Sequence, residues 1–202
     1  MPGNKVEIKY KVKDSKFFGN ISPVKSREEA EEFVSRIKDE YSDATHNVNA
    51  YIIGQGDEAL EYADDDGEPT GSSGPPVLKA INGENLTNTV VVVTRYFGGT
   101  KLGIGGLIRA YGDTARKVID VAEKKELKLC YKIVVKGTYN NIGTIMGQVE
   151  AYHGNIVDTE YGNDSVLVNF YIMPGKYEPL RKSLIEKTGN RVEINIEDKL
   201  YV

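Results

Sequence analysis

The chain has 202 residues, of which 40% are hydrophobic and 28% charged, and its formal net charge is −4 at pH 7. This length allows one large domain or two small ones, and the composition is ordinary for a globular protein. The near balance of charge excludes a basic field over the whole surface, so any contact with nucleic acid must come from a local patch.

The single cysteine, Cys130, excludes an intramolecular disulfide. It lies in an apolar run over 127–135, where a buried thiol is expected rather than a reactive one. No apolar run is long enough to span a membrane, and residues 1–10 lack the apolar core of a secretory signal. We therefore expect a reducing, cytoplasmic location and no membrane partner.

The first part of the chain alternates apolar and polar residues, which predicts strands with one buried face. Ser26 is expected to begin a helix, with Glu29 three residues later as its reciprocal capping partner. Pro75 and Pro76 can begin a second helix, because the first helical positions do not need their N–H groups. The predicted order is strands over 6–12 and 17–24, a helix over 26–41, a strand over 46–54, a loop over 57–74 and a helix over 75–81.

The segment from Thr89 to Tyr111 is the most chemically distinctive part of the sequence. Its four consecutive valines, 90–93, predict a strand that is covered on both faces. Five of the nine residues from Gly98 to Gly106 are glycine, and apolar residues then recur at the three- and four-residue steps of a helix. The first N–H groups of a helix lack internal partners and attract anions. A strand, a glycine loop and a helix in this order therefore predict a site for phosphate or nucleic acid.

The pattern of strands and helices begins again near Glu126, so we place a domain boundary there, between 1–126 and 127–202. The order βαββαβ in the second part is that of the ferredoxin-like motif. Its predicted elements are strands over 127–138, 155–161, 166–173 and 191–197, with helices over 142–152 and 177–187.

Basic and aromatic side chains gather around the glycine loop, with five bases but only one acid over 95–117. Bases and aromatics together suit a nucleic-acid backbone and unstacked bases. The alternative is that the arginines pair with the acidic loop while the aromatics pack in the core. The candidate anion- or nucleic-acid-binding residues are Arg95, Tyr96, Gly98, Gly99, Lys101, Gly103, Gly105, Gly106 and Arg109.

Seven acids and no base lie over 57–68. Closely spaced carboxylates can hold Mg²⁺, so Asp65, Asp66 and Glu68 are candidate metal ligands or members of a polar cleft; the alternative is a solvated, charged loop. His46 is a further candidate for that cleft, although a hydrogen-bonded structural role is simpler. Walker A, Rossmann and nucleophile-elbow patterns are absent, so we expect no cofactor other than Mg²⁺.

Several short motifs stand out along the chain: Asp65–Pro69, Gly71–Gly74, Val91–Gly99, Lys101–Gly103, Gly105–Leu107 and Arg109–Tyr111, with earlier landmarks at Lys13–Phe17, His46–Asn47 and Ala50–Tyr51. Together they closely resemble the motifs of the IMPACT/YigZ family, and the resemblance covers residues 1 to about 125. The remaining part is similar to the last domain of elongation factor G.

The resemblance implies an α+β protein of two domains. The first would have the fold of the second domain of ribosomal protein S5 (ββαβαβα), which also occurs in domain four of elongation factor G. The second would be ferredoxin-like. Eukaryotic members of the family regulate translation initiation by binding the activator of an initiation-factor kinase, partly through an additional N-terminal domain. Here the family block begins almost at residue 1, so we do not expect that partner.

The leading hypothesis is a non-enzymatic regulator of translation that contacts RNA or the ribosome, without DNA specificity. Arg95, Lys101 and Arg109 would meet phosphates, close to the N–H groups of Gly105 and Gly106. One alternative is a magnesium-dependent enzyme that acts on a phosphorylated small molecule. Another is a protein-binding regulator that uses the acidic loop.

Overall fold

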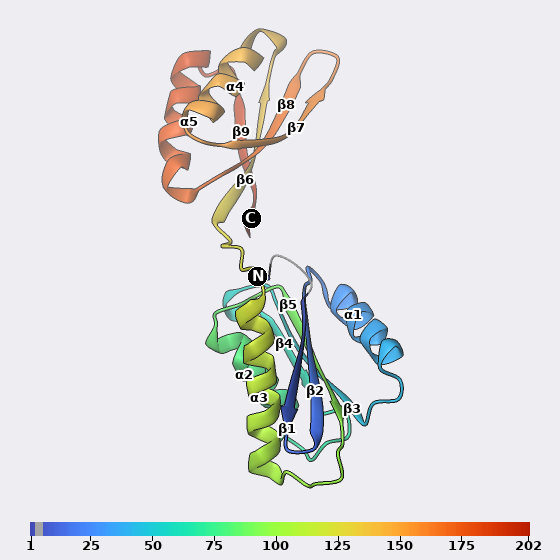
Figure 1. Cartoon of the computed structure of the whole chain (residues 1–202). Coiled ribbons are helices and arrows are strands. Elements are labelled where there is room, and N and C mark those ends of the chain that lie inside the picture. Colours follow the sequence, from blue (N-terminus) through green and yellow to red (C-terminus); the bar gives the residue numbers. More distant parts are fainter. Residues whose placement is uncertain (3–5) are drawn as a thin grey trace. The chain divides into compact units, whose positions relative to one another are not determined.

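The computed structural model describes residues 1–2 and 6–202, apart from the side chain of Asp57. The chain divides into two compact units, Met1–Glu126 and Leu127–Val202 (Figure 1). Each unit is an antiparallel sheet packed against helices, which confirms the predicted α+β class. Within the described residues, every helix is too short or too polar to cross a membrane.

Over the described residues, the sheet of the first unit has five strands, with β5 in the middle. The strand order is β1-β2-β5-β3-β4, and all neighbours are antiparallel. Every residue of β5 except the last is buried, which confirms that the valine run is covered on both faces. The strands are β1 (Val6–Val12), β2 (Ser15–Pro23), β3 (His46–Ile53), β4 (Leu60–Asp64) and β5 (Thr89–Tyr96).

Helices cover both faces of this sheet. One helix, α1 (Arg27–Glu40), packs on the face that carries Val90 and Val92. The other two, α2 (Gly74–Gly83) and α3 (Ile104–Val121), pack on the face that carries Val91 and Val93 (Figure 1). Because successive residues of a strand point to opposite faces, one run of valines supplies two separate cores.

The start of α1 follows the predicted capping pattern with one difference. Ser26 accepts a hydrogen bond from the N–H of Glu29, as expected. The Glu29 carboxylate accepts from the N–H of Lys25, at 2.7 Å, and so reaches one residue earlier than in the standard capping box.

One element was missed, because the predicted loop over 57–74 contains the edge strand β4. The observed order of strands and α-helices in the first unit is therefore ββαββαβα rather than ββαβαβα. The strand pairs with β3 and leaves Leu60 and Tyr62 each 41% exposed. Acids among these residues hid the strand pattern, and pairing with β3 overrides that weak local preference.

The second unit has the predicted order βαββαβ, with its sheet arranged β7-β8-β6-β9. Both helices contribute to a single core, with Ile145 and Leu180 packed against strand residues such as Phe170. Its elements are β6 (Leu129–Gly137), α4 (Ile142–Ala151), β7 (Asn155–Tyr161), β8 (Val166–Ile172), α5 (Pro174–Thr188) and β9 (Glu193–Tyr201), and a 3-10 turn (Tyr139–Asn141) precedes α4.

Candidate functional site

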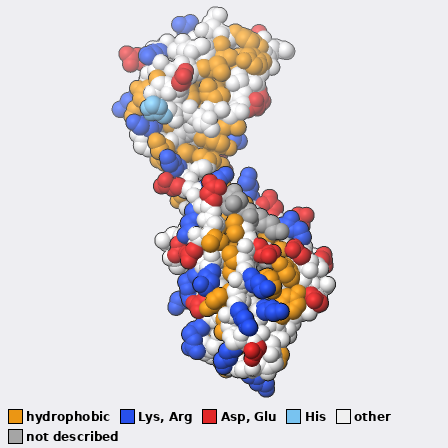
Figure 2. Space-filling model, viewed as in Figure 1, with side chains coloured by type: hydrophobic (Ala, Val, Ile, Leu, Met, Phe, Trp, Pro, Cys, Tyr) orange, Lys and Arg blue, Asp and Glu red, His pale blue; other side chains and the backbone are white. Residues whose placement is uncertain are grey.

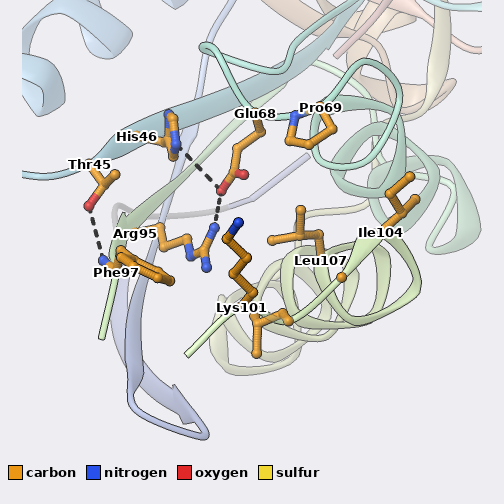
Figure 3. Close-up of a pocket in the computed structure, with 11 residues that line it drawn as sticks. Thr45, His46, Glu68, Pro69, Arg95, Phe97, Lys101, Ile104 and Leu107 are labelled. Carbon is orange, nitrogen blue, oxygen red and sulfur yellow. Dashed lines mark hydrogen bonds and ion pairs between the residues drawn. The ribbon is translucent and has the colours of Figure 1, made fainter. Parts of the chain in front are cut away.

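A cleft of about 460 Å³ opens in the first unit, where β5 ends and α3 begins (Figure 3). One side is apolar and the other carries charged groups, so the cleft combines the two kinds of surface that bind an organic anion. The lining residues are Thr45, His46, Glu68, Pro69, Arg95, Phe97, Lys101, Leu102, Gly103, Ile104 and Leu107.

A buried ion pair lies at the charged side of the cleft. Arg95 Nη1 donates to Glu68 Oε1 at 2.6 Å, and the two side chains are only 6% and 4% exposed. The hydroxyl of Tyr111 donates to the same oxygen at 2.7 Å, and His46 Nε2 lies 3.8 Å from it. A charge is tolerated at such burial only when it is paired and hydrogen-bonded. The network therefore holds Arg95 and Glu68 in place.

Burial raises the pKa of Tyr111 well above its ordinary value, and the adjacent Glu68 carboxylate adds to that shift. The phenol consequently stays protonated and remains a hydrogen-bond donor to Glu68. Tyr111 comes from α3 and Glu68 from the segment after β4, so this contact ties the two walls of the cleft together.

The guanidinium of Arg95 also lies between two aromatic rings. Its carbon is 5.7 Å from the ring centre of Phe17 and 5.4 Å from that of Phe97, within the range of cation–π contacts. Nη2 lies 3.5 Å from Ser15 Oγ, a long hydrogen bond, and the buried Nε has no acceptor among the described residues. The Glu68 carboxylate and the two rings thus fix the position of the Arg95 guanidinium, whose Nε is buried rather than exposed to the cleft.

The loop glycines serve different purposes. A Cβ on Gly98 would lie 2.1 Å from the backbone of Asp14, so Gly98 allows the turn between β1 and β2 to pack against the loop. Gly99 and Gly103 have φ angles of 92° and 72°, which other residues adopt at a cost. Gly103 precedes α3, whose first turn has no side-chain cap among the described residues. The start of α3 is therefore open to an anion.

The candidate metal ligands of the acidic segment have separate structural partners. Asp65 accepts from the N–H groups of Gly71, Ser73 and Gly74 at 2.7–2.9 Å, and so caps the start of α2. Within the described part of the chain, no group of three or more His, Cys, Asp or Glu side chains could hold a metal ion.

Asp66 and His46 join the same scaffold. The Asp66 carboxylate accepts from Lys38 Nζ and from the N–H of Asn47, both at 2.6 Å. His46 Nδ1 lies 2.7 Å from the carbonyl oxygen of Asp66, which is the hydrogen-bonded structural role that the sequence favoured. Much of this acidic segment is therefore part of the folded structure rather than a solvated loop.

The cleft brings together a subset of the residues singled out in the sequence: His46, Glu68, Arg95, Lys101 and Gly103. Arg109 does not line it and lies instead in a groove between α2 and α3. Of the other candidates, Tyr96 donates to Asp43 at 2.6 Å, and Gly98, Gly99 and Gly105 are exposed whereas Gly106 is half-buried.

Sequence reasoning missed most of the apolar side of the cleft. Leu102, Ile104 and Leu107 flank the candidate glycines but carry no polar group to mark them, whereas Phe97 is one of the aromatic residues among the bases. Ile104 and Phe97 are 63% and 45% exposed, which is unusual for such large side chains beside a cavity. A helical stripe in the sequence identifies Leu107 as apolar, but it cannot show that the residue faces a cavity.

Comparison with known proteins identifies the first unit. Residues 13–119 match the family described as the Impact N-terminal domain. The chain belongs to the IMPACT family. The IMPACT family member YvyE of Bacillus subtilis (strain 168) is 33% identical over 191 residues, which are 95% of this chain and 87% of YvyE. The resemblance predicted from the motifs is thereby confirmed.

Two solved structures are also similar to this IMPACT chain. The crystal structure of a hypothetical protein has a TM-score of 0.73 at 25% identity, and the match covers 98% of this chain and 96% of that chain. The two-domain translational regulator Yih1 is 26% identical and covers 60% of this chain and 46% of its own, with a TM-score of 0.36. That score is too low for an argument from its fold, and its role in translation is a property of Yih1.

Proposed function

We propose that this IMPACT family member is a cytoplasmic, non-enzymatic regulator of translation that binds single-stranded RNA, including exposed RNA of the ribosome, through the cleft. The observation that carries the proposal is the union of an apolar wall and a cationic side in one open cavity. Proteins that read single-stranded RNA hold unstacked bases against aromatic or apolar surfaces and meet the backbone with positive charge.

Each part of the cleft has a role in this proposal. An unstacked base packs against the exposed ring of Phe97 and the side chains of Ile104 and Leu107. Its phosphate meets the exposed Lys101 and the uncapped start of α3. Arg95 remains paired with Glu68 and adds positive charge to the cationic side of the cleft. A cleft of about 460 Å³ cannot hold a DNA duplex, so no DNA specificity is expected.

Membership of the IMPACT family supports the link to translation. The motif resemblance implies that eukaryotic members act on translation initiation. Positive charge around the cleft is local, since the whole chain carries a net charge of −4, so binding depends on the cleft residues rather than on a general field.

The test is the binding of a fluorescent, U-rich RNA of about 12 nucleotides, a length within the range of single-strand sites on small domains, at several salt concentrations. Lys101→Ala removes one phosphate contact and lowers the slope of log affinity against log salt by about 0.7. Phe97→Ala removes a stacking surface and weakens binding by about 1–3 kcal/mol.

Matched controls lie in the second unit. Lys182→Ala removes one exposed positive charge, and Tyr161→Ala removes one exposed aromatic ring that does not line the cleft. Both controls should bind RNA as the unmodified protein does. Absence of RNA and ribosome binding by the unmodified protein would end the proposal, and equal losses in variants and controls would move the site away from the cleft.

The size of the cleft favours one alternative, a site for a small phosphorylated ligand, because 460 Å³ falls within the usual range for such sites. The magnesium-dependent enzyme is the specific form of this alternative. Thermal unfolding with nucleotides or sugar phosphates, with and without Mg²⁺, separates the two functions. Stabilisation that requires Mg²⁺ and disappears in Asp66→Asn would favour the enzyme.

The protein-binding regulator remains a third hypothesis, and no contact of the cleft favours it over RNA.

A further inference from the structure

A second cavity in the first unit lies outside the cleft, between α2 and α3. It has a volume of about 360 Å³, and among the described residues no acidic side chain lines it. Its lining includes the apolar residues Pro75, Pro76 and Ile108 and three positive side chains, Lys79, Arg109 and Arg116. Lys and Arg side chains gather over α3 on the face shown in Figure 2.

Two arginines in this groove have the same local arrangement, because the guanidinium of each lies near a glycine four residues earlier. The Nη1 atom of Arg109 lies 3.7 Å from the place that a Cβ on Gly105 would occupy, and Nη1 of Arg116 lies 3.5 Å from that of Gly112. Side chains of a helix lean toward its N-terminus, so each arginine lies over the residue four positions earlier. Both separations are ordinary van der Waals distances, so each guanidinium lies against the helix about one turn before its own residue.

The two Gly-x-x-x-Arg units are seven residues apart, so both guanidinium groups lie on nearly the same side of α3. Seven residues of helix correspond to about 10 Å along the axis, which is too far for both to hold one phosphate. Arg116 also pairs with Asp113, whereas Lys79 and Arg109 have no ion pair within the described residues. The groove thus offers successive anion positions beside apolar side chains.

Residues that line the groove and residues that line the cleft are neighbours in sequence at two places in the chain. Pro69 lines the cleft and Gly71 lines the groove, two residues later. Leu107 lines the cleft and its neighbour Ile108 lines the groove. A flexible single strand with one nucleotide in the cleft can therefore continue its phosphate backbone across the start of α3 into the groove.

We propose that the α2–α3 groove is a second binding site, which holds the phosphate backbone of the same single-stranded RNA that inserts a base into the cleft. This inference rests on the proposed function and extends it from one nucleotide to a track of several. Lys79 and Arg109 make the main phosphate contacts, and Arg116 contributes after sharing its charge with Asp113.

The test compares the RNA of about 12 nucleotides with the dinucleotide UpU, which fills the cleft alone. The double variant Lys79→Ala/Arg109→Ala should lower the salt slope for the longer RNA by about 1.4, since each phosphate contact on a single strand contributes about 0.7. Binding of UpU should stay unchanged. The matched control Lys176→Ala/Lys182→Ala removes the same charge from exposed positions of the second unit.

Three outcomes would overturn the inference. If the unmodified protein binds neither RNA, the proposed function fails together with the groove. If the longer RNA binds but the groove variant behaves as the control does, the groove alone is wrong and the cleft stands. If a peptide of consecutive glutamates competes with the longer RNA at equal affinity and the groove variant abolishes that competition, the groove belongs to an acidic protein partner.

Discussion

The sheets of the two units differ in how many faces they bury. In the first unit β5 is buried on both faces, and its alternate valines enter two cores. In the second unit β8 alternates, with Val168 and Phe170 fully buried and Asn169 half-exposed between them. A strand that is covered on both faces therefore leaves no water-facing side for a polar residue, whereas a strand that is covered on one face does.

This difference explains why a charged strand residue is buried in the first unit and partly exposed in the second. Arg95 follows the buried valines of β5 and needs Glu68 as a buried partner, with both side chains almost inaccessible to solvent. Lys132 of β6 pairs with Glu197 at 2.7 Å, but these side chains are 37% and 45% exposed. Water hydrates both charges of the second pair and screens the attraction between them. The first pair instead forms part of the wall of the cleft. The coverage of β5 on both faces therefore places a buried, paired charge at the candidate site.

The largest expected effect comes from placing a charge within each sheet. Val92→Lys buries an unpaired ammonium, which costs several kcal/mol of the roughly 5–15 kcal/mol that stabilise a domain, so the first unit should unfold. Asn169→Lys, on the half-exposed side of β8, should change stability by less than about 0.5 kcal/mol. Hydrogen exchange with mass spectrometry assigns the loss to a unit. A folded first unit in Val92→Lys would contradict the two-sided interpretation.

The next effect compares the two ion pairs. Arg95→Ala leaves Glu68 buried without its cation and should lower the free energy of unfolding of the first unit by about 3–5 kcal/mol. Lys132→Ala removes a screened pair and should have little effect on the second unit. Urea unfolding measures both changes. The double replacement Arg95→Met/Glu68→Leu should recover much of the loss, and its failure to do so would show that the pair is not the reason for the instability.

The smallest effect is a dependence on alkaline pH. Because the pKa of Tyr111 is raised by folding, its contribution to stability is complete below the unfolded-state pKa, about 10, and is lost as pH rises toward the folded-state value. Above about pH 10 this residue should lower the free energy of unfolding by about 1.4 kcal/mol per pH unit. Tyr111→Phe should lack this part of the slope in urea unfolding followed by circular dichroism. An identical slope in both proteins would show that Tyr111 is not the source.

Much of the fold followed from local patterns in the sequence. The valine run predicted β5, because an uninterrupted apolar strand must be covered on both faces. Ser26 predicted the start of α1, because capping depends on residues only a few positions apart. The alternation in the second half predicted the order βαββαβ. The IMPACT motifs were recognisable for the same reason, since each is a short run of residues that can be read without knowledge of distant contacts.

Long-range packing decided the rest. Glu68 and Arg95 are 27 residues apart in the sequence. Only the folding of the sheet and α3 brings Arg95 and Tyr111 to the same carboxylate oxygen of Glu68. Arg109, so close in sequence to the glycine loop, belongs to a different cavity because the turn of α3 directs it toward α2. Spacing along the chain shows which residues are charged or apolar. Which of them meet depends on how strands pair and helices pack, and that is settled by contacts between segments far apart in the sequence.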